Sequence, residues 1–581
     1  MINENFIRVL HIDLTSERVH IYKREDLNDY LGGVGVAAKL LEEYMRPELP
    51  PLAPEQPIVL AIGAASTIFP VITKTTAMFI SPLTGELGES YAGGRLALTM
   101  FHAGYDAVLI TGRAKNPSYI SVREMLAEIK DARAFWGMNA DGVGQYIRMR
   151  EAFSGKRSIL RIGPAGENLC SFASVCVDTY RHFGRLGLGA VFGSKNLKAL
   201  QIAGDRSIPI PDFKKYGSVY SELYKTVTST EIMSKYHDLG TPVNVVVLNE
   251  GGGLPVENLN AASTDNIEEL SGNTFAKKHL VRKVACTGCP VGCIHIGQFR
   301  REFDHGYEYE AVSVSYDYEL IFALGTFLGI KNSDGVLELI EAVEELGLDA
   351  MSCGVVLGWA TEALKKGIIS EDMTIVPLDF GSLDNYLEAA RYLAYAENEF
   401  YADLAKGVKH ASLKYGGYDF GMQIAGNEMP GYHTGYGALT GAAVGARHSH
   451  LCNAGYSFDQ SKPFDIEALV DYLYAEEVER CLLNSLTICL FARKVYDRDR
   501  IMKVLDCVGK PMTNEELDRA ALRIFKTKLR IKQKLGFKLG NVKLPKRFFQ
   551  TPSMTGQLKE ETAAAVIAAF EKRCEQLLAA D

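Results

Sequence analysis

The spacing of apolar residues changes near residue 206, and this change restricts the chain to a mixed architecture. Before it, short apolar runs end in glycine or proline, as in PIVLAIG (57–63), TAMFISP (76–82) and DAVLITG (106–112). Runs of this length bounded by turn residues are typical of strands. Residues 1–205 are therefore predicted to be rich in β-structure.

Beyond the proline-marked stretch IPIPDF (208–213), apolar residues recur at helical spacing. The segments 334–347, 465–486 and 561–580 show this pattern, and Gly347 is a C-terminal stop signal for the first of them. We therefore predict an α+β chain whose part after residue 205 is mostly helical.

Composition excludes several classes of function. The chain of 581 residues is 47% hydrophobic and 23% charged, which indicates a globular protein. A net charge of -8 and a pI of about 5.9 disfavour nucleic acid as a partner, because phosphate binding needs a basic face. No apolar run reaches the roughly 18 residues of a membrane span, and the first twenty residues lack a signal-peptide pattern. Eleven cysteines then indicate a reducing compartment, and we expect a cytoplasmic protein.

Three cysteines fall within eight residues, in CTGCPVGC (286–293). Cys286, Cys289 and Cys293 have the spacing C-x2-C-x3-C, which lets a tight loop present three thiolates to three corners of a [4Fe–4S] cluster. Zinc with His295 as a further ligand, or three buried structural cysteines, remain as alternatives. The candidates for a fourth thiolate are Cys452, Cys481 and Cys489.

Several stretches together resemble the tungsten-containing aldehyde:ferredoxin oxidoreductases, over nearly the whole chain. The earlier ones are FIRVLHIDLTS, SPLTGELGESYAGG, HAGYDAVLITGRA, IGPAGENLCSFASV and RHFGRLGLGAVFGSKNLKAL. The later ones are CTGCPVGC, YEYEAVS, EELGLDAMS, RHSHLCNAGY, NSLTICLF and LPKRFF. Each piece alone would be weak, but the combination is specific to that family.

The resemblance implies an anaerobic, cytoplasmic oxidoreductase that converts a small aldehyde to a carboxylic acid. The implied cofactors are a tungsten or molybdenum bis-pterin (molybdopterin type) and a [4Fe–4S] cluster, which passes electrons to ferredoxin or a ferredoxin-like subunit. A homodimer or larger assembly is expected. Two alternatives are the active-site subunit of a benzoyl-CoA-reductase-like assembly and a non-catalytic electron-transfer paralogue.

The resemblance also implies a division into three domains. Two packed sheets in residues 1–205 would cradle the bis-pterin. Residues 206–425 would form a helical domain with the three-cysteine loop and the first pterin motif. Residues 426–581 would form a second helical domain with the fourth cluster cysteine and the second pterin motif.

The family's pterin motifs, D-x-x-G-L-D and D-x-x-G-L-C, match residues 344–349 and 484–489. The second motif makes Cys489 the fourth cluster ligand and leaves Cys481 an ordinary helix cysteine. Thr487 stands where the family has glycine. The matched pterin-binding positions are Glu344, Gly347, Leu348, Asp349, Asn484 and Ile488, of which Glu344 and Asn484 replace aspartate.

Two glycine-rich stretches, 92–94 and 181–189, would let the backbone approach the pterins closely, with arginines supplying charge for their phosphates. Lys74 stands where the family has arginine, and most members carry asparagine near the position of Tyr91. Mg²⁺ between the pterin phosphates is a further candidate. The implied contacts are Lys74, Tyr91, Gly93, Arg181, His182, Gly184 and Arg185.

Proton transfer beside the metal needs a carboxylate and a histidine. The family's glutamate lies in a Y-E-S stretch, which matches Tyr309-Glu310-Ala311 and makes Glu310 the implied carboxylate. RHSHL offers two histidines. The neighbouring Arg447, Leu451 and Tyr456 place His450 at the family position, whereas His448 would brace the loop or contact a pterin.

Two further expectations concern the surroundings of the site. The stretch PGYHTGYGALTGAAVGAR (430–447) is expected to line the substrate channel. Some family dimers hold a metal through an E-x-x-H helix motif, and the aligned pair here is Glu338 and Glu341. Two carboxylates at this spacing are more typical of a solvated helix face.

Overall fold

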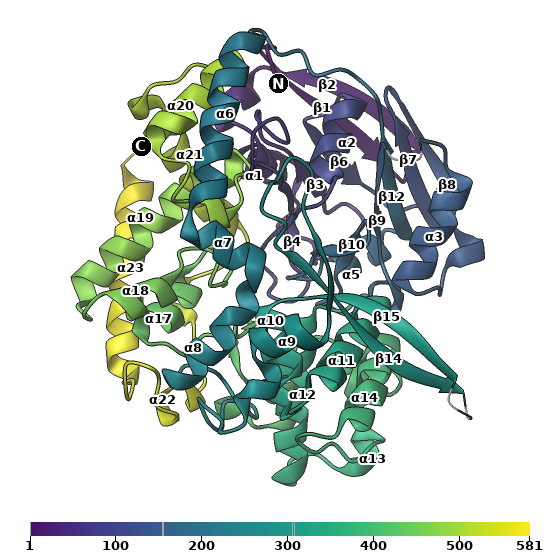
Figure 1. The fold of residues 1–581 in the computed structure, drawn as a ribbon, viewed down its shortest axis with the longest axis vertical. Coiled ribbons are helices and arrows are strands. Elements are labelled where there is room, and N and C mark those ends of the chain that lie inside the picture. Colours follow the sequence, from purple (N-terminus) through teal and green to yellow (C-terminus); the bar gives the residue numbers. More distant parts are fainter. Residues whose placement is uncertain (1, 154–155, 305, 307, 581) are drawn as a thin grey trace.

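The computed structural model describes residues 2–153, 156–304, 306 and 308–580. Two six-stranded sheets lie within residues 7–203, and most later elements are helices. Figure 1 shows the strands of these sheets at the upper right, with helices to the left and below. The predicted α+β class, β-rich first and helical afterwards, is confirmed, while the boundaries at 205 and 425 stay predictions.

The first sheet has the strand order β2-β1-β6-β3-β4-β5. Only β1 and β6 pair in parallel, and the other neighbours are antiparallel. β3 and β4 are buried along their whole length, and helix α1 (Gly33–Tyr44) packs on them. The strands predicted near 57–63, 76–82 and 106–112 are β3, β4 and β6. The bounds are β1 (Ile7–Asp13), β2 (Arg18–Arg24), β3 (Ile58–Ala61), β4 (Thr75–Ile80), β5 (Leu87–Ala92) and β6 (Ala107–Thr111).

The second sheet has the order β11-β10-β9-β12-β7-β8. Its edge strand β11 contacts the edge strand β5 of the first sheet, so the two sheets meet where Tyr91 and Arg181 lie. The bounds are β7 (Ser118–Arg123), β8 (Leu126–Asp131), β9 (Arg157–Arg161), β10 (Val175–Val177), β11 (Arg181–Phe183) and β12 (Leu197–Ala203).

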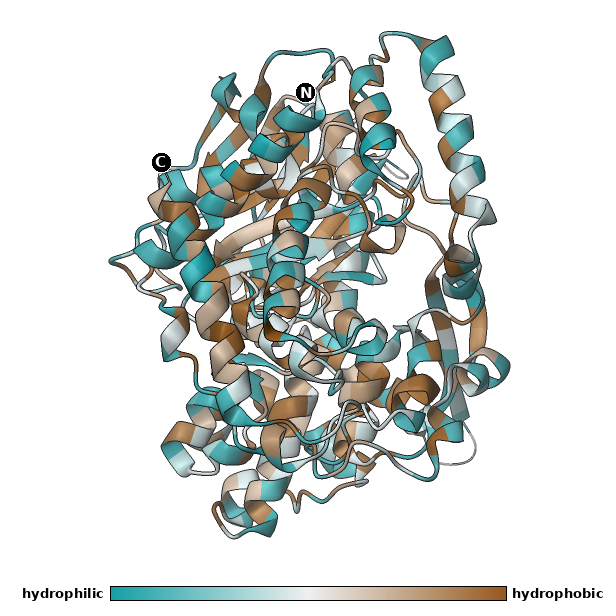
Figure 2. Ribbon diagram, turned by 90° about the vertical axis from the view of Figure 1, so that its left-hand side faces the viewer, coloured by the Kyte–Doolittle hydropathy of each residue, from teal (hydrophilic) through white to brown (hydrophobic). Residues whose placement is uncertain are grey.

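Three segments predicted to be helical are helices, namely α11 (Ser333–Leu346), α19 (Ile466–Ser485) and α23 (Glu560–Ala579). Gly347 follows α11 with φ 75°, the left-handed conformation that a glycine stop provides. Figure 2 shows helices at the outside that carry both hydrophilic and hydrophobic residues, as expected for helices with one face on the core. Within the described part of the chain, no single helix is long and apolar enough to span a membrane. One sharply bent pair, Tyr318–Leu328 with Ser333–Leu346, reaches that length and apolar composition only when the two are taken together.

A three-stranded antiparallel sheet interrupts the helical part, which the sequence pattern did not indicate. It consists of β13 (Leu280–Val284), β14 (Ile294–Asp304) and β15 (Glu308–Tyr316). The three-cysteine loop connects β13 to β14. The hairpin β14–β15 is buried where β14 begins and β15 ends, and it is exposed towards the turn between the two strands. Figure 1 shows the hairpin projecting at the lower right.

Two helix ends dock on the two sheets in the same way. The amide of Asp349 donates to the carbonyl of Phe172 (3.0 Å), and the amide of Ser174 donates to that of Gly347 (2.8 Å). On the first sheet's side, the amide of Cys489 donates to Val71 (3.0 Å) and the amide of Lys74 to Thr487 (3.3 Å). Isolated bridges, Ala173 with Leu348 and Ile72 with Ile488, complete each contact.

Glycines make this close docking sterically feasible. A Cβ at Gly163 would lie 2.5 Å from the carbonyl oxygen of Leu346, and one at Gly63 would lie 2.5 Å from that of Leu486. The segments 344–349 and 484–489 therefore occupy equivalent structural positions, one on each sheet.

Candidate active site

A cavity of about 390 Å³ lies where the two sheets meet the helical part. Its walls come from β5, β11, the cysteine loop, the docked segments after α11 and α19, and the RHSHL stretch. Most of the predicted site residues line it, whereas Gly347, Glu310 and His448 do not. Those that line it are Lys74, Tyr91, Gly93, Arg181, His182, Gly184, Arg185, Cys286, Cys289, Cys293, Glu344, Leu348, Asp349, His450, Asn484, Ile488 and Cys489.

The cysteine loop is pressed against the glycine-rich turn after β5. The amide of Thr287 donates to the carbonyl of Gly94 (3.1 Å). A Cβ at Gly93 would lie 2.5 Å from Sγ of Cys286 and 3.4 Å from Nζ of Lys74. The absence of a side chain at Gly93 is thus what allows the loop, the lysine and the turn to converge.

Burial and charge have different net effects on the pKa values of the three loop cysteines. Burial alone would raise the pKa of the Cys286 thiol, but the charges of Lys74 and Arg181 outweigh burial and lower it. Burial also raises the pKa of Cys289 to about 12 and of Cys293 to about 11, and the neighbouring thiolates add to this. A bound cation would remove that cost, because a coordinating metal deprotonates its thiols.

Cys489 is the fourth cysteine that lines the cavity. Cys452 and Cys481 are buried elsewhere and do not line it. His295 is also outside it, with Nε2 3.0 Å from the carbonyl oxygen of His237. No group of three or more His, Cys, Asp or Glu among the described residues is arranged around a single ion.

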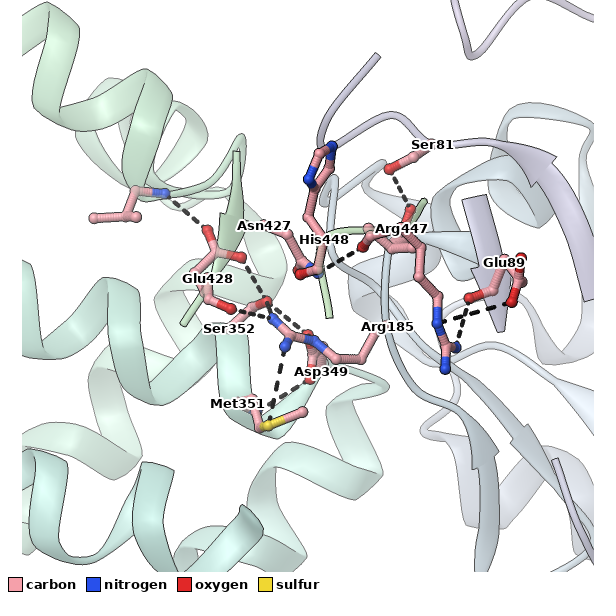
Figure 3. A network of polar contacts seen from close by, with 12 residues as sticks. Ser81, Glu89, Arg185, Asp349, Met351, Ser352, Asn427, Glu428, Arg447 and His448 are labelled. Carbon is pink, nitrogen blue, oxygen red and sulfur yellow. Dashed lines mark hydrogen bonds and ion pairs between the residues drawn. The ribbon is translucent and has the colours of Figure 1, made fainter. Parts of the chain in front are cut away.

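The segment after α11 is fixed by a polar network (Figure 3). Asp349 caps α12 (Ala350–Lys365) by accepting from the amide of Met351 (3.1 Å). Its other oxygen accepts from Ser352 (2.6 Å) and from Nε of Arg185 (3.1 Å). Arg185 also donates to the carbonyl of Glu428 (3.0 Å), so it ties the glycine-rich stretch after β11 to the helical part.

The two docked segments each place a neutral hydrogen-bonding group at their first position. Burial raises the pKa of Glu344 to about 8, so this carboxyl is protonated at neutral pH. Asn484 is an amide. Both side chains line the cavity and both can donate and accept hydrogen bonds.

Thr487 adopts φ 60° at the position equivalent to Gly347. This conformation is uncommon for a residue with a Cβ. The hydroxyl of Thr487 lies 2.7 Å from that of Ser66, which belongs to the connection between β3 and β4. The threonine therefore adds a hydrogen bond across the contact that the glycine at 347 cannot make.

Tyr91 belongs to a buried ionic cluster at the wall of the cavity. Its hydroxyl donates to Glu89, and the guanidinium of Arg447 lies 4.7 Å from the centroid of its ring. Lys528 neutralises Glu89 at 2.7 Å. The tyrosine is thereby held in one orientation.

His450 and Glu319 form a pair inside the cavity. Nε2 of His450 lies 3.4 Å from Oε1 of Glu319, and the hydroxyl of Tyr432 donates to the same oxygen at 2.9 Å. Burial alone would raise the pKa of Glu319, but these hydrogen bonds outweigh it and lower that pKa. Burial lowers the pKa of His450 despite the nearby carboxylate. The stable state at neutral pH is a carboxylate beside a neutral imidazole.

The prediction that Glu310 supplies the site carboxylate is corrected by its position. Glu310 lies on the exposed part of β15, with its side chain 45% exposed, and pairs with Arg301 at 2.6 Å. Residue 310 lies six positions before the buried end of that strand, so it cannot reach the cavity. The sequence does contain a signal for Glu319: a further Tyr-Glu pair, Tyr318-Glu319, which opens the apolar helix α10 (Tyr318–Leu324).

His448 faces away from the cavity. Its Nε2 lies 3.2 Å from Oε2 of Glu86 and 3.0 Å from Nζ of Lys532, and Lys532 lies 2.8 Å from Glu86. The carbonyl of His448 accepts from Asn427 at 2.9 Å (Figure 3). These contacts match the expected bracing of the loop.

Two other expectations meet the geometry. Of the stretch 430–447, only Arg447 lines the cavity, and half of the stretch forms the buried helix α17 (Tyr436–Val444). On α11, Glu341 pairs at 2.9 Å with Arg301 of the exposed part of the hairpin, so that carboxylate belongs to an ion pair.

The cavity wall contains buried polar atoms for which the described residues offer no hydrogen-bond partner. Such atoms are rare in folded proteins unless a ligand or solvent satisfies them. They are Ser174 Oγ, Tyr316 Oη, Asn427 Oδ1, Arg447 Nη2 and His450 Nδ1. Together with the cationic Lys74, Arg181 and Arg185, they suit a large, polar and anionic group.

Comparisons with known proteins agree with this arrangement. Residues 9–204 match the family profile "Aldehyde ferredoxin oxidoreductase, N-terminal domain", and residues 218–577 match "Aldehyde ferredoxin oxidoreductase, domains 2 & 3". The tungsten-containing aldehyde ferredoxin oxidoreductase of Pyrococcus furiosus is 31% identical over 96% of this chain and 94% of its own length. That of Thermococcus kodakarensis is 30% identical, over 96% and 93%.

Solved structures with the same fold include the active site complex BamBC of benzoyl coenzyme A reductase with 1,5-dienoyl-CoA, with a TM-score of 0.83 and 19% identity over 99% of this chain and 94% of that one. At this identity the likeness concerns the fold alone. The family matches and the two archaeal relatives show that this chain belongs to the aldehyde ferredoxin oxidoreductases, a family of oxidoreductase enzymes.

Proposed function

We propose that the protein oxidises an aldehyde to a carboxylic acid at a tungsten or molybdenum bis-pterin and passes the electrons through a [4Fe–4S] cluster to ferredoxin. The observation that carries this proposal is the convergence of four cysteines and two equivalently docked segments on one cavity. The balanced reaction is RCHO + H₂O → RCOOH + 2H⁺ + 2e⁻, with each electron leaving singly.

The residues present fit both groups. Cys286, Cys289, Cys293 and Cys489 form the donor set for the cluster, and Lys74 lies among them. Burial alone would lower the pKa of Lys74, but Cys489 and Cys286 outweigh it, so the lysine stays charged and can balance an anionic cluster. The absence of a single-ion arrangement is compatible with a cluster, whose irons spread the four thiolates apart.

One docked segment is assigned to each pterin. Glu344, Leu348 and Asp349 would hold the first, and Asn484 and Ile488 the second. Glu344 and Asn484 offer hydrogen bonds to the ring edges without a net charge at neutral pH. The remaining contacts are assigned to Tyr91, Gly93, Arg181, His182, Gly184 and Arg185, with Mg²⁺ as a further candidate at the phosphates.

A tungsten bis-pterin, when bound, would supply the two-electron acceptor that no side chain provides. The contribution of the chain is proton transfer and orientation. With Nε2–H of His450 directed at Glu319, the free Nδ1 is an acceptor that can take a proton from water as it adds to the aldehyde carbon. Glu319 then stabilises the imidazolium, and Tyr432 fixes the carboxylate.

A substrate panel tests the proposal. Anaerobically purified protein should reduce a viologen dye with one or more aldehydes. It should neither reduce the dye with a dienoyl-CoA thioester nor reoxidise the reduced dye with an aryl-CoA thioester. Turnover with the thioester couple but with no aldehyde would assign the chain to a benzoyl-CoA-reductase-like role. Absence of both activities in protein that carries iron would favour the electron-transfer paralogue.

A further inference from the structure

The three-cysteine loop reaches the outer surface of the protein. Ala285 and Gly288 are exposed, and Gly288 is one residue from Cys289. Gly288 has φ 78°, and a Cβ there would lie 2.8 Å from the carbonyl oxygen of Thr67. The loop is therefore closely packed on the connection between β3 and β4. A partner that covers Gly288 would come close to the cluster, where electron transfer is fastest.

Four segments surround the three-cysteine loop, namely helix α7, strand β13, the turn after β5 and the residues that follow Cys489. Helix α7 (Glu231–Asp238) is fixed to it by His237, whose Nδ1 lies 2.7 Å from the carbonyl oxygen of Val291. The same helix stacks Tyr236 on Phe491, just beyond Cys489, with ring centroids 3.9 Å apart. Strand β13 leads directly into the loop, and the turn after β5 accepts the hydrogen bond from Thr287.

These segments carry many cations. We define the basic rim as six Lys and Arg residues on these four segments. They are Arg95 after the β5 turn, Lys235 on α7, Arg282 and Lys283 on β13, and Arg493 and Lys494 after the 3₁₀ helix η7 (Leu490–Ala492). Figure 1 shows α7 directly below α6, to the left of β4.

Few carboxylates on these segments balance the basic rim. Asp178 lies 3.9 Å from Arg95, and Asp238 lies 4.0 Å from Lys283. Glu231 is the third acid, at the start of α7. Among the described residues, no carboxylate lies within ion-pair distance of Lys235, Arg282, Arg493 or Lys494. The surplus of positive charge is local, since the whole chain has a net charge of -8.

Resting on the function proposed above, we propose that the basic rim is the docking surface for the electron partner, an acidic iron–sulfur protein of the ferredoxin type. Unpaired cations around an electron exit would steer a negatively charged partner and set its orientation. Exposed charges of this kind act mainly on the association rate and are screened by salt.

The test uses the loaded enzyme and an acidic [4Fe–4S] ferredoxin. The variant Lys235→Glu/Arg282→Glu reverses two exposed charges that do not line the cavity. Its dissociation constant for ferredoxin, and its KM for ferredoxin in aldehyde oxidation, should rise about tenfold or more at low salt, the lower end of what steering supplies. Turnover with benzyl viologen should stay within about twofold of wild type. Lys494→Glu should act in the same direction.

A matched variant separates rim charge from total charge. Lys572→Glu/Arg18→Glu makes the same charge change at exposed residues of α23 and β2, and it should bind ferredoxin as wild type does. Equal weakening in both double variants, or wild-type binding by the rim variant, overturns the proposal. Binding is measured without turnover, so an enzyme that fails to oxidise aldehydes but still binds ferredoxin through the rim would contradict the proposed function and leave the docking surface standing.

Discussion

Nε2 of His450 lies 3.4 Å from Oε1 of Glu319, and the second ring nitrogen of His450 has no partner among the described residues. This geometry makes His450 the proton acceptor of the site. His450→Asn should abolish aldehyde turnover while tungsten, iron and pterin remain bound, because the side chain is not among the cofactor contacts. Single-turnover kinetics and elemental analysis check both halves.

His448→Asn is the paired control. Outside the cavity, Nε2 of His448 lies 3.2 Å from Glu86 and 3.0 Å from Nζ of Lys532. Burial alone would raise the pKa of Glu86, but Lys532 and His448 outweigh it and hold that pKa at about 2. The variant should lower the thermal midpoint and leave kcat per bound tungsten nearly unchanged. Loss of kcat in His448→Asn, with an active His450→Asn, would reverse the assignment.

Glu319→Gln should cut kcat by about 10²–10⁴, the range for one acid–base group, with cofactor retained. The carboxylate orients His450 and stabilises its protonated form, and an amide does this poorly. Glu310→Gln removes a carboxylate that pairs with Arg301 on the exposed hairpin and should leave kcat within about twofold. Equal losses in both variants would mean that Glu319 has no special role.

The pH dependence follows from the same pair. His450 acts as a base only when neutral, and burial holds its pKa below the usual range, with Glu319 opposing that shift. The kcat of the wild type should therefore be flat from pH 8 down to about pH 6.5 and fall only below it, as the imidazole becomes protonated. Glu319→Gln removes the opposing charge, so its residual activity should fall at a still lower pH. A shift of that limb to higher pH would contradict the pairing.

Gly347 tests the docking of the first segment on the second sheet. It has φ 75°, and an added Cβ would lie 2.7 Å from the amide nitrogen of Gly163. Gly347→Ala should cost more than about 2 kcal/mol of unfolding free energy, because left-handed strain and a backbone clash act together. Gly367 has φ 66°, but an added Cβ there would have no atom within 4 Å. Gly367→Ala should therefore show the backbone strain alone, about 1 kcal/mol of unfolding free energy. Urea unfolding that finds equal losses would refute the close contact.

Much of the architecture could be predicted because it depends on local pattern. The period of apolar residues gave β3, β4 and β6 and the helices α11, α19 and α23, and Gly347 marked the end of α11. The cofactor positions came from resemblance, and the structure then brought Cys489 to the cavity while Cys452 and Cys481 stayed outside it. Spacing alone could not have chosen among these three, because their positions depend on how α19 packs.

The misplaced carboxylate has a physical explanation. The pairs Tyr309-Glu310 and Tyr318-Glu319 lie nine residues apart, and only the three-dimensional path of β15 decides which glutamate reaches the cavity. The resemblance matched the two docked segments to the two pterin motifs, but it did not reveal how they dock on the sheets. The docking consists of backbone hydrogen bonds and of close contacts at Gly63 and Gly163. The two segments share few side chains, because Thr487 and Cys489 occupy the positions that Gly347 and Asp349 have in the first segment.

Elemental analysis of anaerobically purified protein tests the central claim most directly. The wild type should contain about four irons and one tungsten or molybdenum per chain, as one [4Fe–4S] cluster and one mononuclear centre require. Cys489→Ser should lose iron and visible absorbance, and Cys481→Ser should keep both. Iron at this level without tungsten or molybdenum, or a Cys489→Ser protein with full iron beside an iron-poor Cys481→Ser protein, would contradict the account.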